Sequence, residues 1–185
     1  MNRTDRRILG AARITDPGLR QAYARCRRLH ARHGRSYYLA ILLLPPWKRP
    51  YAHALYGFAR FADEIVDTES ATSRAAHFAG WSRQVLDAPT DGNGSADDVT
   101  MALRDTMRRW DIPIEHVTAF LGSMWADRTV SAYETIEDFN RYMYGSAAVI
   151  GLQMVPFLGP LHDEAYPRVR ALGEAFQLRS WEAGR

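Results

Sequence analysis

The sequence predicts an all-α protein in which helices pack on helices. Apolar residues recur at the three- and four-residue spacing of helices along most of the 185-residue chain, and the alternation typical of strands is nearly absent. Residues that start and stop helices punctuate the same stretches. The composition, 46% hydrophobic and 24% charged, is that of an ordinary globular protein, so residues 1–185 are predicted to form a single domain.

The clearest helix signal lies near the N-terminus. Asp16 is expected to cap a helix whose first residue is Pro17, since proline is tolerated where the backbone N–H has no helical partner. This helix should run to about His33 and stop at Gly34. Similar signals predict helices over 37–44, 50–67, 72–86, 99–110, 113–128, 135–157 and from 163 or 167 toward the C-terminus, with a polar loop over 87–98.

The charge is unevenly distributed along the chain. The net charge is +3, but residues 1–50 carry 12 Lys and Arg against 2 Asp and Glu. Such a front favours an anionic partner such as phosphate, diphosphate, nucleic acid or a lipid headgroup, or it is simply a solvated surface. The single cysteine, Cys26, excludes an intrachain disulfide. We expect a cytoplasmic protein, because no secretory signal and no apolar stretch of membrane-spanning length is visible.

Four polar side chains form a narrow stripe on the expected helix that ends at Asp67. At about 100° per residue, Tyr56, Arg60, Asp63 and Asp67 share one line, and apolar residues cover most of the remaining surface. Two buried carboxylates four residues apart repel each other unless a cation compensates them. Because Mg²⁺ binds one or two carboxylates plus substrate phosphates, the stripe indicates a magnesium site. The alternative is an exposed acidic face on which Arg60 pairs with Asp63 or Glu64.

The segment from His33 to Tyr38 precedes this stripe in the sequence. It lies at an expected helix start, where free N–H groups attract phosphate, and His33, Arg35 and Ser36 would add donors. Taken alone, Ser36 is an ordinary N-cap. Together with a magnesium stripe, the segment suggests a diphosphate substrate.

Small residues interrupt the expected helix over 135–157, which Thr135 and Asp138 should open as a capping box. The run YGSAA at 144–148 and Gly151 cost helix stability. Such residues allow close approach by another helix or by a slender apolar ligand, and both interpretations stay open here.

These features together resemble the squalene/phytoene synthase family of head-to-head prenyltransferases and, within it, the bacterial phytoene synthases. The resemblance rests on AYARCRRLHARHGRSYYLAILLLPPWKR, ALYGFARFADEIVD, YMYGSAAVIG and LGEAFQL, and it is most specific in the string Tyr56-x-x-x-Arg60-x-x-Asp63-x-x-x-Asp67. It implies an isoprenoid synthase-type helical bundle with a central apolar cavity. Two prenyl diphosphates would bind there through Mg²⁺ held by two acidic motifs.

The resemblance also implies roles for single residues. The catalytic set is Tyr56, Arg60, Asp63 and Asp67, of which the two aspartates hold the metal. The substrate-binding residues that it implies are His33, Arg35, Ser36 and Tyr37 in the diphosphate segment, with Tyr144 and Gln177 lining the cavity.

The resemblance weakens after Leu178. Ser180 stands where the family has an asparagine, and Gly184 stands where the first aspartate of the second acidic motif is expected. We therefore expect an incomplete prenyl synthase domain that lacks the family's C-terminal helices. If the chain ends at Arg185, catalysis should be weak or absent, because half of the metal cage is missing.

The function that the resemblance implies is condensation of two geranylgeranyl diphosphates to phytoene through a cyclopropyl diphosphate intermediate, in carotenoid biosynthesis with Mg²⁺. The alternatives are a squalene or dehydrosqualene synthase and a non-catalytic truncated helical remnant. The expected partners are a prenyl diphosphate and, transiently, the surface of a membrane. A nucleic-acid partner, which only the basic residues 1–50 suggest, is not expected.

Overall fold

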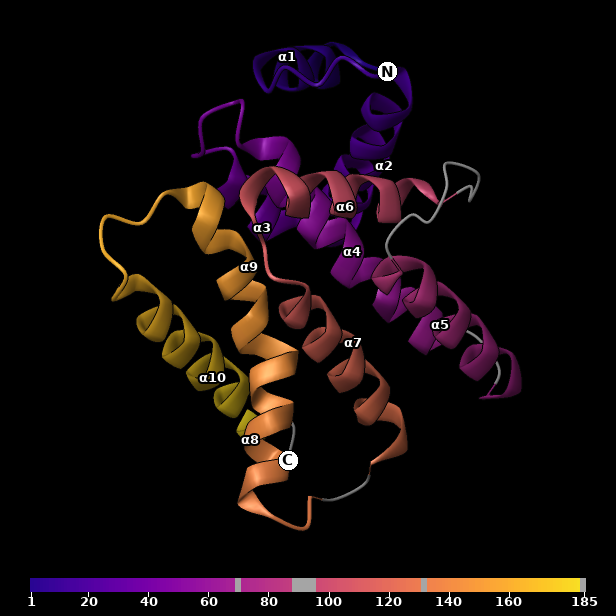
Figure 1. Cartoon of the computed structure of the whole chain (residues 1–185), viewed down its shortest axis with the longest axis vertical. Helices are drawn as coiled ribbons and strands as arrows, with labels where there is room; N and C mark the ends of the chain where they lie inside the picture. The colour runs from indigo at the N-terminus through magenta and orange to yellow at the C-terminus, as the bar shows by residue number, and fades with distance from the viewer. Residues whose placement is uncertain (69–70, 88–95, 131–132, 184–185) are drawn as a thin grey trace. The chain divides into compact units, whose positions relative to one another are not determined.

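A computed structural model describes residues 1–68, 71–87, 96–130 and 133–183, and within these it leaves the side chains of 68, 71–72, 127–129 and 179–183 undescribed. Every regular element in these ranges is helical, which confirms the predicted all-α class (Figure 1). The chain divides into two compact units, Met1–Trp110 (unit 1) and Asp111–Arg185 (unit 2). The single domain over 1–185 stays a prediction.

Unit 1 is built around three long helices that pack on one another: α2 (Pro17–His33), α4 (Arg49–Thr68) and α6 (Asp98–Trp110). Figure 1 shows α6 crossing α2 and α4. The rings of Tyr23, Tyr51 and Phe58 are buried in this centre. The remaining helices of unit 1 are α1 (Arg3–Ala11), α3 (Arg35–Ile41) and α5 (Ala71–Leu86).

The predicted bounds of α2 are confirmed to the residue. The Asp16 side chain accepts a hydrogen bond from the Leu19 N–H at 2.8 Å, and Gly34 ends the helix. This agreement arises because the cap residues act locally, within one turn of the helix end.

The start of α3 corrects the sequence prediction. The helix begins at Arg35 rather than at Tyr37, and its N-cap is Gly34, without a side-chain hydrogen bond. The prediction that Ser36 caps this helix is therefore wrong. The helix also ends at Ile41 rather than at the expected Leu44.

Unit 2 contains α7 (Ile114–Thr129), α8 (Ile136–Met143), η1 (Tyr144–Ala148), α9 (Val149–Leu158) and α10 (Ala165–Ala183). The predicted helix over 135–157 is confirmed as the continuous run α8–η1–α9, and Thr135 caps it as expected. One turn, at the small residues 144–148, is a π-helix. Such turns are rare and lodge an extra residue in the helix.

The small residues of this run bring helices close together. A Cβ on Gly145 would overlap Ser123 and the backbone carbonyl of Ala119 on α7. A Cβ on Gly173 of α10 would lie 2.8 Å from the Cα of Ala148. Close helix packing, one of the two interpretations of this run, is thus realised at these positions.

No helix among the described residues is long and apolar enough to cross a membrane. The predicted loop over 87–98 lies largely outside the described residues.

Candidate functional site

The predicted polar stripe runs along one edge of α4. Tyr56, Arg60 and Asp63 are half-buried and Asp67 is exposed, as expected for side chains that share one line of a helix. The rest of α4 packs inward, where Phe58, Ala62, Ile65 and Val66 are buried, among others. The helical spacing therefore predicted correctly that these four polar side chains share one edge of α4 and that apolar side chains cover the rest of the helix.

The carboxylates of the stripe are not buried, contrary to the sequence argument. The Asp63 side chain is 42% exposed, and Asp67 is exposed. Water can hydrate both carboxylates, so neither charge requires a compensating cation. The pairing that was weighed as the alternative is present, because Arg60 lies 3.7 Å from the Asp63 carboxylate and 3.5 Å from that of Glu64.

The diphosphate segment predicted from the sequence meets this stripe within unit 1. The His33 Nε2 atom lies 3.6 Å from Glu64 Oε1, the same oxygen that Arg60 Nε approaches. Glu64 thereby links the end of α2 to the stripe. Sequence reasoning assigned Glu64 no such role, because a contact across 31 residues leaves no local pattern.

Gly34 explains how the chain passes so close to α4. A Cβ at Gly34 would lie 2.6 Å from the ring and hydroxyl atoms of Tyr56. A larger residue at this corner would therefore displace the Tyr56 ring, although the backbone angles of Gly34 are open to other residues. Burial raises the pKa of the Tyr56 phenol, which keeps it protonated and able to donate a hydrogen bond.

The side chains that follow Gly34 could bind a diphosphate, but the helix start contributes less than the sequence suggested. Arg35, Ser36 and Tyr37 are all exposed. The helix that they begin has seven residues, so its macrodipole is short. The cationic and hydroxyl side chains themselves, rather than the helix end, are the groups available to an anion.

Unit 2 places Tyr144 and Gln177 around a third residue. Tyr144 lines an open pocket of about 930 Å³, and so does Tyr142. Gln177 Nε2 donates to the Tyr142 hydroxyl at 3.3 Å. The Arg170 guanidinium lies over the Tyr144 ring, 5.1 Å from its centroid. Tyr142 is the residue that the sequence reasoning missed, although it stands two positions before a residue that it named.

The same pocket is mostly apolar. Its lining includes three small residues of α7 and three tyrosines: Ala119, Gly122, Ala126, Tyr133, Tyr142 and Tyr144. Its volume is in the range of small-molecule sites.

A preformed metal cage is not found in the part of the chain that the structure describes, since no group of three or more His, Cys, Asp or Glu there could hold an ion. The side chains of Ser180 and Gly184, at the expected second acidic motif, lie outside the described residues.

Solved structures of helical synthases share this fold. A dehydrosqualene synthase solved with a ligand matches 90% of this chain with a TM-score of 0.73 and 26% identity, and the match covers 60% of that chain. The squalene synthase HpnC from Alicyclobacillus acidocaldarius shares the fold, with a TM-score of 0.72 and 23% identity over 90% of this chain and 62% of its own.

Sequence comparison places the chain more narrowly. The model of the squalene/phytoene synthase family matches residues 30–180, and the chain belongs to this family. The 15-cis-phytoene synthase of Synechococcus elongatus is 33% identical over 142 residues, which are 76% of this chain and 46% of that protein. The chloroplastic phytoene synthase of Daucus carota is 31% identical over 86% of this chain and 42% of its own length. The chain thus spans less than half of these relatives.

Proposed function

We propose that this chain is a head-to-head prenyltransferase of the phytoene synthase type, which condenses two geranylgeranyl diphosphates to phytoene through a cyclopropyl diphosphate intermediate. The observation that carries the proposal is the meeting of two separate motifs within unit 1. His33 and Gly34 contact Glu64 and Tyr56, so the cationic segment and the acidic stripe share one accessible edge. Membership of the family and the phytoene synthase relatives support the same activity.

The residues of the stripe fit a magnesium ion that is shared with a substrate. Asp63 and Asp67 are oxygen donors one helical turn apart, and both are accessible to solvent. Mg²⁺ retains several waters and is commonly held by one or two carboxylates together with phosphate oxygens, so two aspartates suffice for such a site. When bound, the ion would neutralise charge on the diphosphate leaving group.

The chain's own groups would bind and orient the diphosphate. Arg35 and Ser36 are exposed donors at the start of α3, and Arg60 holds the Asp63 carboxylate in place through their ion pair. Tyr56, protonated and fixed against Gly34, can donate a hydrogen bond to a phosphate oxygen. Tyr37, 71% exposed, offers an aromatic face beside these donors. Tyr144 and Gln177 are proposed to contact the prenyl chain.

The test is conversion of geranylgeranyl diphosphate in the presence of Mg²⁺, with the hydrocarbon product identified by chromatography. Slow formation of phytoene is expected, because the family's second acidic motif is not matched within this sequence, and Asp63→Asn should abolish it. A squalene-type product from farnesyl diphosphate would favour the alternative synthase. If neither Mg²⁺ nor prenyl diphosphate binds or raises the melting temperature, the chain is a non-catalytic remnant.

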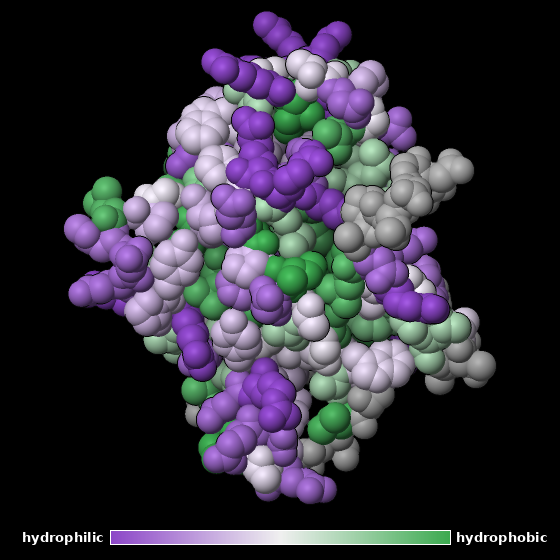
Figure 2. All heavy atoms as spheres, in the orientation of Figure 1, coloured by the Kyte–Doolittle hydropathy of each residue, from purple (hydrophilic) through white to green (hydrophobic). Residues whose placement is uncertain are grey.

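A transient contact with a membrane surface is the second part of the proposal. Near α3 the chain exposes large apolar side chains, Leu39, Leu42, Leu43 and Trp47, and Leu43 is 88% exposed. Figure 2 shows hydrophilic side chains gathered at the end of the view where α1 lies, and Arg3, Arg6 and Arg7 of that helix are exposed. Apolar and cationic groups together favour anionic lipid. Flotation with anionic but not neutral liposomes tests this contact.

A further inference from the structure

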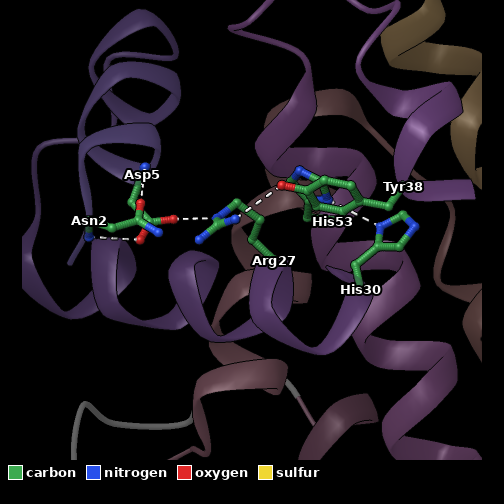
Figure 3. A network of polar contacts seen from close by, with 6 residues as sticks. All are labelled: Asn2, Asp5, Arg27, His30, Tyr38 and His53. Carbon is green, nitrogen blue, oxygen red and sulfur yellow. Dashed lines mark hydrogen bonds and ion pairs between the residues drawn. The ribbon is translucent and has the colours of Figure 1, made fainter. Parts of the chain in front are cut away.

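Two histidines lie beneath the proposed diphosphate edge. His30 of α2 and His53 of α4 are each 1% exposed, and their Nδ1 atoms are 3.1 Å apart (Figure 3). A hydrogen bond between two like nitrogens needs one protonated and one unprotonated atom. The pair therefore has a defined arrangement of protons.

Each ring of the pair stacks on a tyrosine. The His30 ring lies flat against Tyr56, with centroids 3.8 Å apart and planes within 7°. The His53 ring stacks on Tyr38 of α3, with centroids 5.3 Å apart. The pair thus contacts one ring from the stripe and one ring from the helix that carries the diphosphate segment.

Further bonds anchor this cluster to the first helix. Arg27 Nη1 donates to the Tyr38 hydroxyl at 3.0 Å, and Arg27 Nε donates to the Asp5 carboxylate (Figure 3). Asp5 in turn forms a capping box with Asn2 at the start of α1. Side chains from α1, α2, α3 and α4 are therefore linked in one buried network.

The proton arrangement of the pair follows from one unpartnered atom. His30 Nε2 is buried and has no hydrogen-bond partner, so a proton on it would be a buried donor without an acceptor. An unsatisfied buried N–H donor is avoided when the His30 proton lies on Nδ1 and is donated to His53 Nδ1. Burial lowers the pKa of His30 to about 4 and, with the neighbouring His30, Arg27 and Arg49, that of His53 to about 3, so both rings are neutral near pH 7.

We propose that His30, held by its hydrogen bond to His53, is a positioning residue that fixes the Tyr56 ring for diphosphate binding. The claim rests on the proposed function for its ligand but not for its geometry. Tyr56 has two neighbours that decide its place: Gly34 borders its hydroxyl end, and His30 covers its face. Without the His30 ring, the face of Tyr56 loses its support.

The first experiment measures the affinity for inorganic pyrophosphate with Mg²⁺ by calorimetry. His30→Ala removes the stacked ring and should weaken binding about tenfold, because small displacements of a positioned group are costly. His30→Phe keeps the stacked face and should retain affinity within about twofold. Tyr23→Phe is the control: Tyr23 lies on α2 like His30, and the substitution removes its hydroxyl contacts with Asp105 and Thr106 of α6, away from Tyr56.

Two outcomes of this experiment would overturn the proposal. One is unchanged affinity in His30→Ala. The other is an equal loss of affinity in Tyr23→Phe at a matched loss of melting temperature, which would mean that stability alone sets the affinity.

The second experiment is independent of the ligand. Nuclear magnetic resonance of the wild type should show the His30 proton on Nδ1 and the Tyr56 ring protons shifted by the stacked imidazole. The Tyr56 shift should vanish in His30→Ala and persist in His30→Phe. If the wild type does not bind pyrophosphate at all, the proposed function fails, and these Tyr56 signals still decide whether His30 positions the ring. An unchanged Tyr56 signal in His30→Ala rejects the proposal.

Discussion

The candidate residues of the two units are held by different kinds of contact. In unit 1, Tyr56 on α4 packs against a buried aromatic ring and a network of hydrogen bonds. In unit 2, Tyr142 and Tyr144 lie on helices that pack closely because a glycine has no side chain at the contact. Tyr56 is stacked on His30, and the network behind it reaches Asp5. Gly145, by contrast, lies against Ser123 and the Ala119 carbonyl because it has no Cβ.

The difference predicts opposite sensitivities in the two units. Unit 1 should be damaged when a buried polar or aromatic group is removed, because its partners lose their bonds. Unit 2 should be damaged when a single methyl group is added, because its helices have no room for it. Four experiments on stability and titration test this contrast.

The largest effect is expected at the buried ion pair of unit 1. Arg27→Met leaves the Asp5 carboxylate, whose side chain is 2% exposed, without its charged partner. Breaking a buried pair from one side costs about 3–5 kcal/mol of unfolding free energy, which urea unfolding measures. Arg108→Met is the matched control, since Arg108 is 78% exposed in its pair with Asp105 and should cost under about 1 kcal/mol. Equal losses in both variants would contradict the role given to the network.

The counterpart in unit 2 is Gly145→Ala. The new Cβ must displace the Ala119 backbone as well as the Ser123 hydroxyl, which should cost about 2–3 kcal/mol. Gly122→Ala on α7 is the control, because nothing lies within 4 Å of its added Cβ, and alanine should stabilise the helix by about 0.5–1 kcal/mol. Urea unfolding of the two variants side by side would refute the packing argument if both moved in the same direction.

A third expected effect is a loss of unfolding free energy at low pH. The pKa values of His30 and His53, about 4 and about 3 in the folded chain, lie below the ordinary value of 6.5. Between pH 7 and 5 the unfolded chain therefore takes up protons that the folded chain does not. The stability that the neutral pair contributes is fully present above pH 6.5 and falls with the pH, by on the order of 2 kcal/mol for each histidine at pH 5.

The measurement is the free energy of unfolding at pH 7 and at pH 5. A double variant, His30→Phe with His53→Phe, serves as the control and should lose most of the pH dependence. A wild type as stable at pH 5 as at pH 7 would mean that the pair is hydrated or charged.

Much of the fold could be predicted from the sequence, because helix ends and faces are set by neighbours within one or two turns. The bounds of α2 and the grouping of polar side chains on one edge of α4 were predictable on these grounds. Helix α1 was not predicted, because it has only nine residues and begins directly after its cap residue Asn2 at the start of the sequence. The π-helical turn over 144–148 was not predicted either, since it forms where Gly145 meets another helix.

The candidate site likewise has a part that local sequence predicts and a part that depends on contacts between distant residues. The stripe from Tyr56 to Asp67 follows from helical periodicity alone. The contacts that give it a setting join residues far apart in the chain: His33 with Glu64, His30 with Tyr56, and in unit 2 Gln177 with Tyr142. No local pattern encodes such contacts, so the sequence could indicate candidate residues but not the contacts that hold them.

The smallest expected effect separates a true helix cap from a mistaken one. Asp16→Ala removes the acceptor of the Leu19 N–H and should cost about 1 kcal/mol. Ser36→Ala should change the unfolding free energy by less than about 0.5 kcal/mol, because Ser36 is exposed and Gly34 occupies the cap position. Ser36→Ala should instead weaken pyrophosphate binding, whereas Asp16→Ala should leave it unchanged. If Ser36→Ala destabilised the fold as much as Asp16→Ala, the hydroxyl would be a structural cap and its assignment to the diphosphate edge would lose its basis.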